Sequence, residues 1–180
     1  MKWDTILNCT VVWKNIFKSL YKSTCDAKLR WFQVRLLYKL LPTNRFLYLR
    51  KLKDTELCTF CHCCIENLSH LFWDCTHTQK FWDEWILWIK SAGEHCQNVQ
   101  LTKQHLLMGV NEESGVGRAF YVLLLLAKFH LYKRKLSGQT PNMVAYVASA
   151  KVRYTDEKYL SVICNKTSND WSLYDALLQS

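Results

Sequence analysis

Proline and glycine are scarce in this chain, with two and five copies among 180 residues. Both residue types interrupt regular structure, so their scarcity predicts long uninterrupted elements, most naturally helices. Long apolar runs are also missing, since the longest, residues 119–127, is far too short to cross a bilayer and ends at Lys128. The apolar start, residues 5–13, contains Asn8 and Thr10 and lacks the form of a secretory signal peptide. We therefore expect an intracellular protein, nuclear or cytoplasmic, that does not enter a membrane.

Catalytic signatures are absent as well. Polymerases hold two metal ions on paired aspartates, and this chain has no Asp-Asp pair; the segment Tyr154-Thr-Asp-Glu157 is a poor substitute within a predicted helix. A zinc protease needs His-Glu-x-x-His, and a nucleobase deaminase needs His-x-Glu with Pro-Cys-x-x-Cys. Neither arrangement occurs. We expect that the chain is not an enzyme.

Cysteine, in contrast, is abundant, with nine copies. An odd number fits a disulfide framework poorly, and without a signal peptide we expect reduced thiols that bind metal. Four residues form the pattern Cys-x2-Cys-x8-His-x4-Cys: Cys58, Cys61, His70 and Cys75. Three thiolates and one imidazole are the donors of a closed tetrahedral zinc site, with no open position for water. The spacing predicts a Cys-Cys-His-Cys (CCHC) zinc knuckle over residues 58–75, with one structural Zn²⁺.

A second register of this knuckle stays open. Cys61 and Cys64 also form a Cys-x2-Cys pair, so a set of Cys61, Cys64, His70 and Cys75 competes with the first. Further candidate ligands lie nearby in the sequence: His62, Cys63 and His77.

Hydrophobic periodicity predicts an all-α fold, a helical domain with the knuckle embedded in it. The expected helices lie within residues 2–22 (with helical spacing from residue 13), 27–41, 44–51, 76–90, 101–108, 118–136, 140–164 and 171–178. Their predicted first residues or caps are Asp26, Thr43 or Asn44, Thr76 or Thr78, Thr102, Pro141 and Asp170. An apolar stripe of Phe81, Trp85, Trp88 and Ile89, and the run 122–126, are expected in the core. We divide the chain into a basic, zinc-binding part, residues 1–92, and a C-terminal helical part, residues 93–180.

The positive charge is concentrated before the knuckle. The net charge is +9; residues 1–57 hold twelve Lys/Arg against four Asp/Glu, whereas residues 58–180 hold twelve against eleven. A basic segment with aromatic residues next to a zinc knuckle suggests a polyanionic partner, most simply nucleic acid. The alternative is a solvated cationic surface.

Within the helix predicted for residues 27–41, Leu29, Leu36 and Leu40 share one face, and cations cluster beside it. Cations next to exposed rings can hold phosphates while the rings stack on bases. Alternatively, Trp31 and Tyr38 belong to the core and the cations only face water. The candidate nucleic-acid-binding residues, which continue along the basic run toward the knuckle, are Lys28, Trp31, Arg35, Tyr38, Lys39, Arg45, Arg50, Lys51 and Lys53.

Several segments together resemble one family. They are Trp31-Phe-Gln-Val-Arg35, Leu41-Pro-Thr-Asn44, Leu57-Cys-Thr-Phe-Cys61, Glu66, His70-Leu-Phe-Trp-Asp-Cys75 and Phe81-Trp82, with weaker matches at Ala127-Lys-Phe-His-Leu-Tyr-Lys133 and Glu157-Lys-Tyr159. On these residues the chain resembles the zinc-binding C-terminal tail of the reverse-transcriptase polyprotein of LINE-type (non-LTR) retrotransposons.

The resemblance implies the first ligand register, Cys58, Cys61, His70 and Cys75. It also implies that the tail binds RNA or DNA during target-primed reverse transcription, with the catalytic parts of such polyproteins lying upstream. We therefore expect a detached, non-catalytic zinc module that binds RNA and/or DNA with low sequence specificity, because phosphate contacts carry no sequence information. Other parts of the retrotransposon protein are further candidate partners. The alternative is a structural or protein-interaction helical module that does not bind nucleic acid.

Overall fold

A computed structural model describes residues 3, 12–93, 96–109, 117–163 and 172–178, and the statements below concern these residues. This part of the chain is all-α and carries the Cys58, Cys61, His70 and Cys75 group, as the sequence predicts. Its elements are α2 (Trp13–Ser23), α3 (Ala27–Leu37), α4 (Asn44–Tyr48), the π-helical turn η1 (His70–Asp74), α5 (Thr76–Lys90), α6 (Lys103–Met108), α7 (Arg118–Leu136), α8 (Met143–Ile163) and α9 (Ser172–Leu178). None of the described helices is long and apolar enough to cross a membrane.

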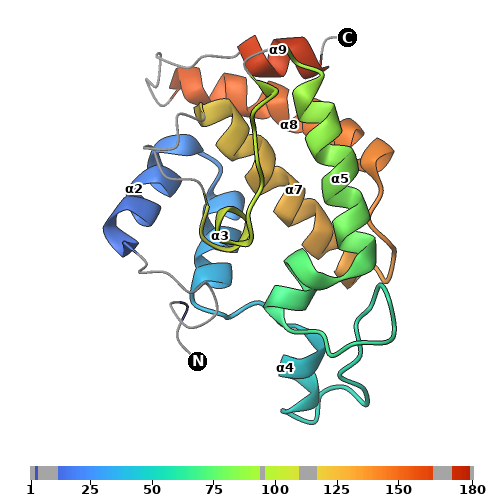
Figure 1. Cartoon of the computed structure of the whole chain (residues 1–180). Helices are drawn as coiled ribbons and strands as arrows, with labels where there is room; N and C mark the ends of the chain where they lie inside the picture. Colours follow the sequence, from blue (N-terminus) through green and yellow to red (C-terminus); the bar gives the residue numbers. More distant parts are fainter. Residues whose placement is uncertain (1–2, 4–11, 94–95, 110–116, 164–171, 179–180) are drawn as a thin grey trace.

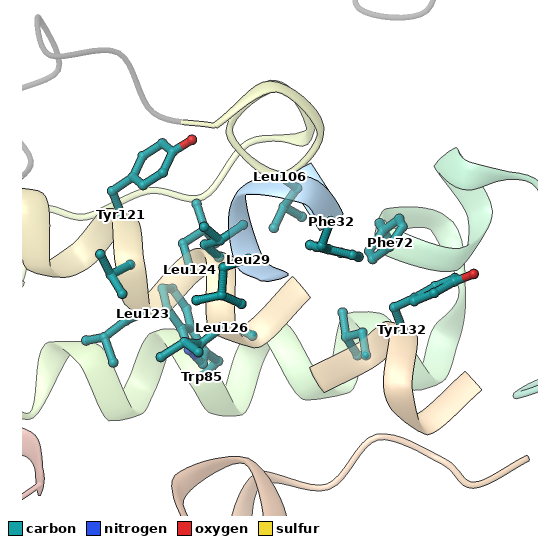
Figure 2. Close-up of a cluster of buried hydrophobic side chains, with 14 of the residues drawn as sticks. Leu29, Phe32, Phe72, Trp85, Leu106, Tyr121, Leu123, Leu124, Leu126 and Tyr132 are labelled. Atoms are coloured by element: carbon teal, nitrogen blue, oxygen red, sulfur yellow. The ribbon is translucent and has the colours of Figure 1, made fainter. Parts of the chain in front are cut away.

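Helix α7 lies at the centre of the molecule (Figure 1). Residues 119–128 are all buried, because α7 packs against α2, α3, α8 and α9. Helix α5 joins the same core through rings that meet edge to face, with the Trp85 and Phe120 centroids 5.4 Å apart. Figure 2 shows side chains of α3, α5 and α6 gathered with those of α7, among them Leu29, Trp85, Leu106, Leu123 and Leu124. The expected burial of the run 122–126 is confirmed.

A buried polar chain crosses this apolar core. The ammonium group of Lys128 donates to Gln33 Oε1 at 2.6 Å, and Gln33 Nε2 donates to the carbonyl oxygen of Leu107 at 3.2 Å. These two hydrogen bonds link α7 to α3 and α6. Burial lowers the pKa of Lys128 to about 7, because a charged amine loses its hydration there.

The bounds of most predicted helices are confirmed to within one or two residues. The Asp26 side chain caps α3 by accepting from the backbone N–H groups of Lys28 and Leu29, and Thr102 caps α6. Helix α7 has the predicted bounds. In the expected core stripe of α5, Phe81, Trp85 and Ile89 are buried and Trp88 is half-buried. The predicted cap Asp170 lies outside the described residues.

Helix α3 ends earlier than predicted, at Leu37 instead of residue 41. Lys39 takes a left-handed conformation with φ 58°, and the Leu40 N–H turns back to the Arg35 carbonyl at 2.7 Å. Such a turn closes a helix by satisfying its last carbonyl groups. Leu40 therefore does not share the buried face of Leu29 and Leu36, and 53% of it is exposed.

Two further helix predictions need correction. Helix α4 stops at Tyr48, three residues before the predicted end. Helix α8 begins at Met143, so Pro141 is not its first residue. Asn142 provides the cap instead, because its side chain accepts from the Ala145 N–H at 2.9 Å.

The division of the chain between residues 92 and 93 stays a prediction. Contacts of α7 with α2 and α3 connect the two predicted parts.

Candidate metal centre and basic aromatic surface

The first half of the knuckle is a tight loop closed by an antiparallel bridge between Leu57 and Ile65. Inside it, the Cys58 N–H donates to the Cys64 carbonyl at 2.8 Å, and the Phe60 N–H donates to Cys58 Sγ at 3.3 Å. His62 takes a left-handed conformation, with φ 56°, which turns the chain sharply after Cys61. Figure 1 shows this loop together with α4 at one end of the molecule.

The second half of the knuckle is the turn η1 and the start of α5. The Cys75 N–H donates to the His70 carbonyl at 2.9 Å, a bond across five residues that brings the two ligands to the same side of the turn. The Asn67 side chain caps the turn by accepting from the His70 N–H at 2.9 Å. Backbone N–H groups of His77 and Thr78, in the first turn of α5, point at the Cys75 sulfur. A helix N-terminus favours negative charge, so this position suits a thiolate.

The donor atoms of Cys58, Cys61, His70 and Cys75 all lie within 4.8 Å of one another. The Cys58 and Cys75 sulfurs are 3.8 Å apart, and Cys61 Sγ is 3.3 Å from His70 Nε2. Tetrahedral zinc, with bonds of about 2.3 Å to sulfur and about 2.1 Å to nitrogen, would separate these pairs by about 3.8 Å and about 3.6 Å. Cys58 and Cys75 are fully buried and His70 is 8% exposed. The four residues therefore fit one closed structural zinc ion.

The structure brings together the ligands of the first register, with Cys58, and not those of the second register, with Cys64 in its place. Cys64 is exposed and belongs to a separate group with Cys61 and Cys63. His62 and His77, the other candidate ligands, are exposed and lie outside the Cys58, Cys61, His70 and Cys75 group.

The thiols of this group differ in their acidity. The Cys58 thiol donates to the Cys75 sulfur, which lowers the pKa of Cys75 to about 5 and raises that of Cys58. Burial raises the pKa of Cys61, but hydrogen bonds from the backbone N–H groups of Cys63 and Cys64 outweigh it and bring the pKa to about 7. The thiolate is the form of cysteine that binds a metal ion. The lowered pKa values of Cys75 and Cys61 therefore favour metal binding near neutral pH.

Glu66 supports the knuckle from inside the protein, a role that the sequence analysis missed. Its fully buried carboxylate accepts from the Asn44 N–H and the Thr59 N–H, both at 2.8 Å. The ammonium group of Lys135 lies 3.6 Å from Glu66 Oε1 and also donates to the Pro42 carbonyl at 2.8 Å. Glu66 thus joins the knuckle, the start of α4 and the end of α7. No local sequence pattern indicates this pairing, because its charged partners are 69 positions apart.

Three of the predicted nucleic-acid-binding residues share one face of α3, and a fourth, Tyr38, follows at its C-cap, all at spacings of three and four residues. We call Lys28, Trp31, Arg35 and Tyr38 the α3 stripe. Trp31 is 65% and Tyr38 is 61% exposed, so neither ring belongs to the core. Among the described residues, no carboxylate lies within 4.0 Å of the Lys28 or Arg35 side-chain nitrogens. Phe17 of α2 extends the aromatic surface, with its ring centroid 6.2 Å from that of Tyr38.

The other five predicted residues lie beyond the stripe in the sequence, and four of them contact other side chains. Lys39 follows the end of α3 and lies 4.5 Å from the Trp3 ring centroid. Arg45 pairs with Glu56 at 3.1 Å, and Lys53 donates to Asn44 Oδ1 at 2.8 Å. Arg50 lies 3.6 Å from the Phe46 ring centroid, and Lys51 is exposed.

No protein-family model matches the chain, and no curated protein is significantly similar to it. The interpretation of the site therefore depends on its own residues.

Proposed function

We propose that the protein is a non-catalytic zinc module that binds RNA or DNA, related to the C-terminal tail of LINE-type reverse transcriptases. The α3 stripe carries this proposal. It alternates cations and exposed rings along α3 and its C-cap, in the order Lys28, Trp31, Arg35, Tyr38. Cations along such a surface neutralise phosphates, and each exposed ring offers a face on which a base stacks.

Burial energetics support a ligand for this surface. Large aromatic residues normally bury their rings, since they contribute most to core and interface energies. The rings of Trp31 and Tyr38 are more than 60% exposed, so the free protein gains little stabilisation from burying them. A ligand that covers both rings would gain it. Bases of a single strand can stack on them without any reading of base edges, which predicts low sequence specificity.

The zinc ion in this proposal is structural. Four protein donors fill its coordination, so it supplies folding energy, about 10–16 kcal/mol for a knuckle, and no water activation. Cys58, Cys61, His70 and Cys75 hold it, and Glu66 fixes the loop to α4 and α7. The knuckle is thereby joined to α7, which packs against α3.

A protein-interaction module is the second candidate function. Helix α8 has apolar residues that are widely exposed on one side, including Val144 (79%), Val152 (66%) and Tyr159 (69%). Exposed apolar patches mark protein contacts in many proteins. The remaining parts of a retrotransposon polyprotein would be partners of this class.

A fluorescence anisotropy titration of the zinc-loaded chain tests the proposal. The ligands are labelled single-stranded and duplex RNA and DNA of one length and scrambled sequence. We expect micromolar or tighter binding to single strands, and Trp31→Ala should weaken it about 5- to 150-fold, since a stacked base contributes about 1–3 kcal/mol. Tyr159→Ala removes an equally exposed ring from α8 and serves as the matched control. Absence of binding at low salt would refute the proposal and favour the protein-interaction module.

A further inference from the structure

Three thiols gather on the outer side of the zinc site. The sulfurs of Cys61, Cys63 and Cys64 lie within 4.8 Å of one another. Cys63 and Cys64 are exposed, whereas Cys61 is half-buried. The group therefore opens to solvent, while the Cys58, Cys61, His70 and Cys75 group faces the interior. Cys61 belongs to both groups.

The backbone holds these thiols in place. The left-handed turn at His62 directs the chain back, so that the N–H groups of Cys63 and Cys64 reach the Cys61 sulfur. The Cys64 carbonyl is fixed by its bond from the Cys58 N–H, at 2.8 Å. The positions of Cys63 and Cys64 thus depend on the same loop that presents Cys58 and Cys61 to zinc. A site preformed in this way loses little conformational freedom when it binds an ion.

The chemistry of three clustered sulfurs selects a soft ion. Thiolates prefer Zn²⁺ and Cu⁺ among first-row metals, whereas Mg²⁺ and Ca²⁺ require oxygen donors. Three sulfurs suffice for a three-coordinate thiophilic ion, or for a four-coordinate one completed by water. A thiolate sulfur has more than one free electron pair, so Cys61 can donate to two ions at once.

We propose that Cys61, Cys63 and Cys64 bind a second thiophilic metal ion, which shares the Cys61 sulfur with the structural zinc. Binding exchanges the thiol protons of Cys63 and Cys64 for two metal–sulfur bonds, and both protons go to solvent with no change of oxidation state. The proposal depends on the knuckle geometry and is independent of nucleic-acid binding.

The same geometry argues against Cys63 and Cys64 as replacement ligands for the structural zinc. Cys58, Cys75 and His70 are buried on the inner side of Cys61. A replacement would have to draw an exposed thiol inward and leave a buried thiol without a partner. Adding an ion on the outer side disturbs neither group.

Cadmium alone is the probe for the test, because it is a soft ion that favours thiolate donors. The reduced, metal-free full chain is titrated with Cd²⁺ in the absence of oxygen, and bound metal is counted after gel filtration. We expect two ions per wild-type chain and one per Cys63→Ser/Cys64→Ser chain. Cys25→Ser/Cys96→Ser removes two thiols from elsewhere in the described part and should still bind two. Equal stoichiometry in the wild type and the Cys63→Ser/Cys64→Ser variant would overturn the proposal.

A measurement on the unmodified chain guards against a folding defect in the variant. The second equivalent of Cd²⁺ should release about two protons into weakly buffered solution. Release of none at that step would overturn the proposal as well. Helical circular dichroism of the double variant with one ion should equal that of the wild type, since the side chains of Cys63 and Cys64 are exposed.

Discussion

Replacing Glu66 by glutamine tests whether the knuckle is fixed to the helices by a buried carboxylate. The substitution keeps the shape of the side chain and removes its charge. One of the two backbone N–H groups, of Asn44 or Thr59, then faces an amide NH₂ instead of an oxygen. A buried donor without an acceptor costs about 1–3 kcal/mol. Lys135, whose side chain is 5% exposed, also loses its counter-charge.

The expected loss follows from these contacts. Breaking a buried ion pair by removing one partner costs about 3–5 kcal/mol, and the remaining bond from Lys135 to the Pro42 carbonyl keeps the loss near the lower end. Denaturant unfolding of the zinc-loaded protein should show this decrease in the free energy of unfolding. A second change, Lys135→Met, made in the Glu66→Gln background should recover part of the loss, because the unpaired buried charge disappears.

Glu56→Gln is the matched control for this prediction. Glu56 also pairs with a cation, Arg45, but both side chains are substantially exposed, at 30% and 44%. Exposed pairs contribute about 0–1 kcal/mol. If Glu66→Gln destabilises the protein no more than Glu56→Gln, the reasoning about the buried carboxylate is wrong.

Three further predictions concern the metal, the pH dependence and the core. Cys58→Ser should lose the structural zinc and Cys64→Ser should keep it; equal zinc in the wild type and Cys58→Ser by metal analysis would contradict the ligand assignment. Lys128 has a pKa of about 7 in the fold and 10.5 ordinarily, so the unfolded chain binds more protons between these pH values. The contribution of Lys128 to stability should therefore rise with pH across this window by up to about 1.4 kcal/mol per unit, and Lys128→Met should remove that contribution from a denaturation series; an unchanged slope would contradict the burial argument. Leu123→Ala, at a fully buried position of α7, should cost about 2–5 kcal/mol in the free energy of unfolding. Leu136→Ala, on the same helix but 63% exposed, should cost less than about 0.5 kcal/mol. Similar losses of stability for both variants would contradict the burial of Leu123 in the core.

Local signals in the sequence predict much of this fold. Helix bounds and caps depend on neighbours within a few positions, so Asp26, Thr102 and the bounds of α7 are read correctly. The ligand set is also local, since the loop and the turn η1 bring Cys58, Cys61, His70 and Cys75 together within one short segment.

The features that the sequence does not reveal depend on pairing over long distances or on backbone geometry. The pairs Glu66–Lys135 and Gln33–Lys128 join residues 69 and 95 positions apart, and each is visible only once α7 is packed. The left-handed turn at Lys39 shortens α3 although lysine does not favour that conformation. Tertiary contacts also decide which of the predicted cations form hydrogen bonds within the protein, as Lys53 does with Asn44.

The salt dependence of binding tests the central claim about the α3 stripe most directly. The logarithm of the association constant for a single strand should fall linearly with the logarithm of the salt concentration, by about 0.7 per phosphate contact. Lys28→Ala/Arg35→Ala should make this slope shallower by about 1.4. Lys80→Ala/Lys151→Ala, which removes the same charge from exposed positions on α5 and α8, should leave the slope unchanged. Identical slopes for the wild type and Lys28→Ala/Arg35→Ala would contradict the claim that nucleic acid binds along α3.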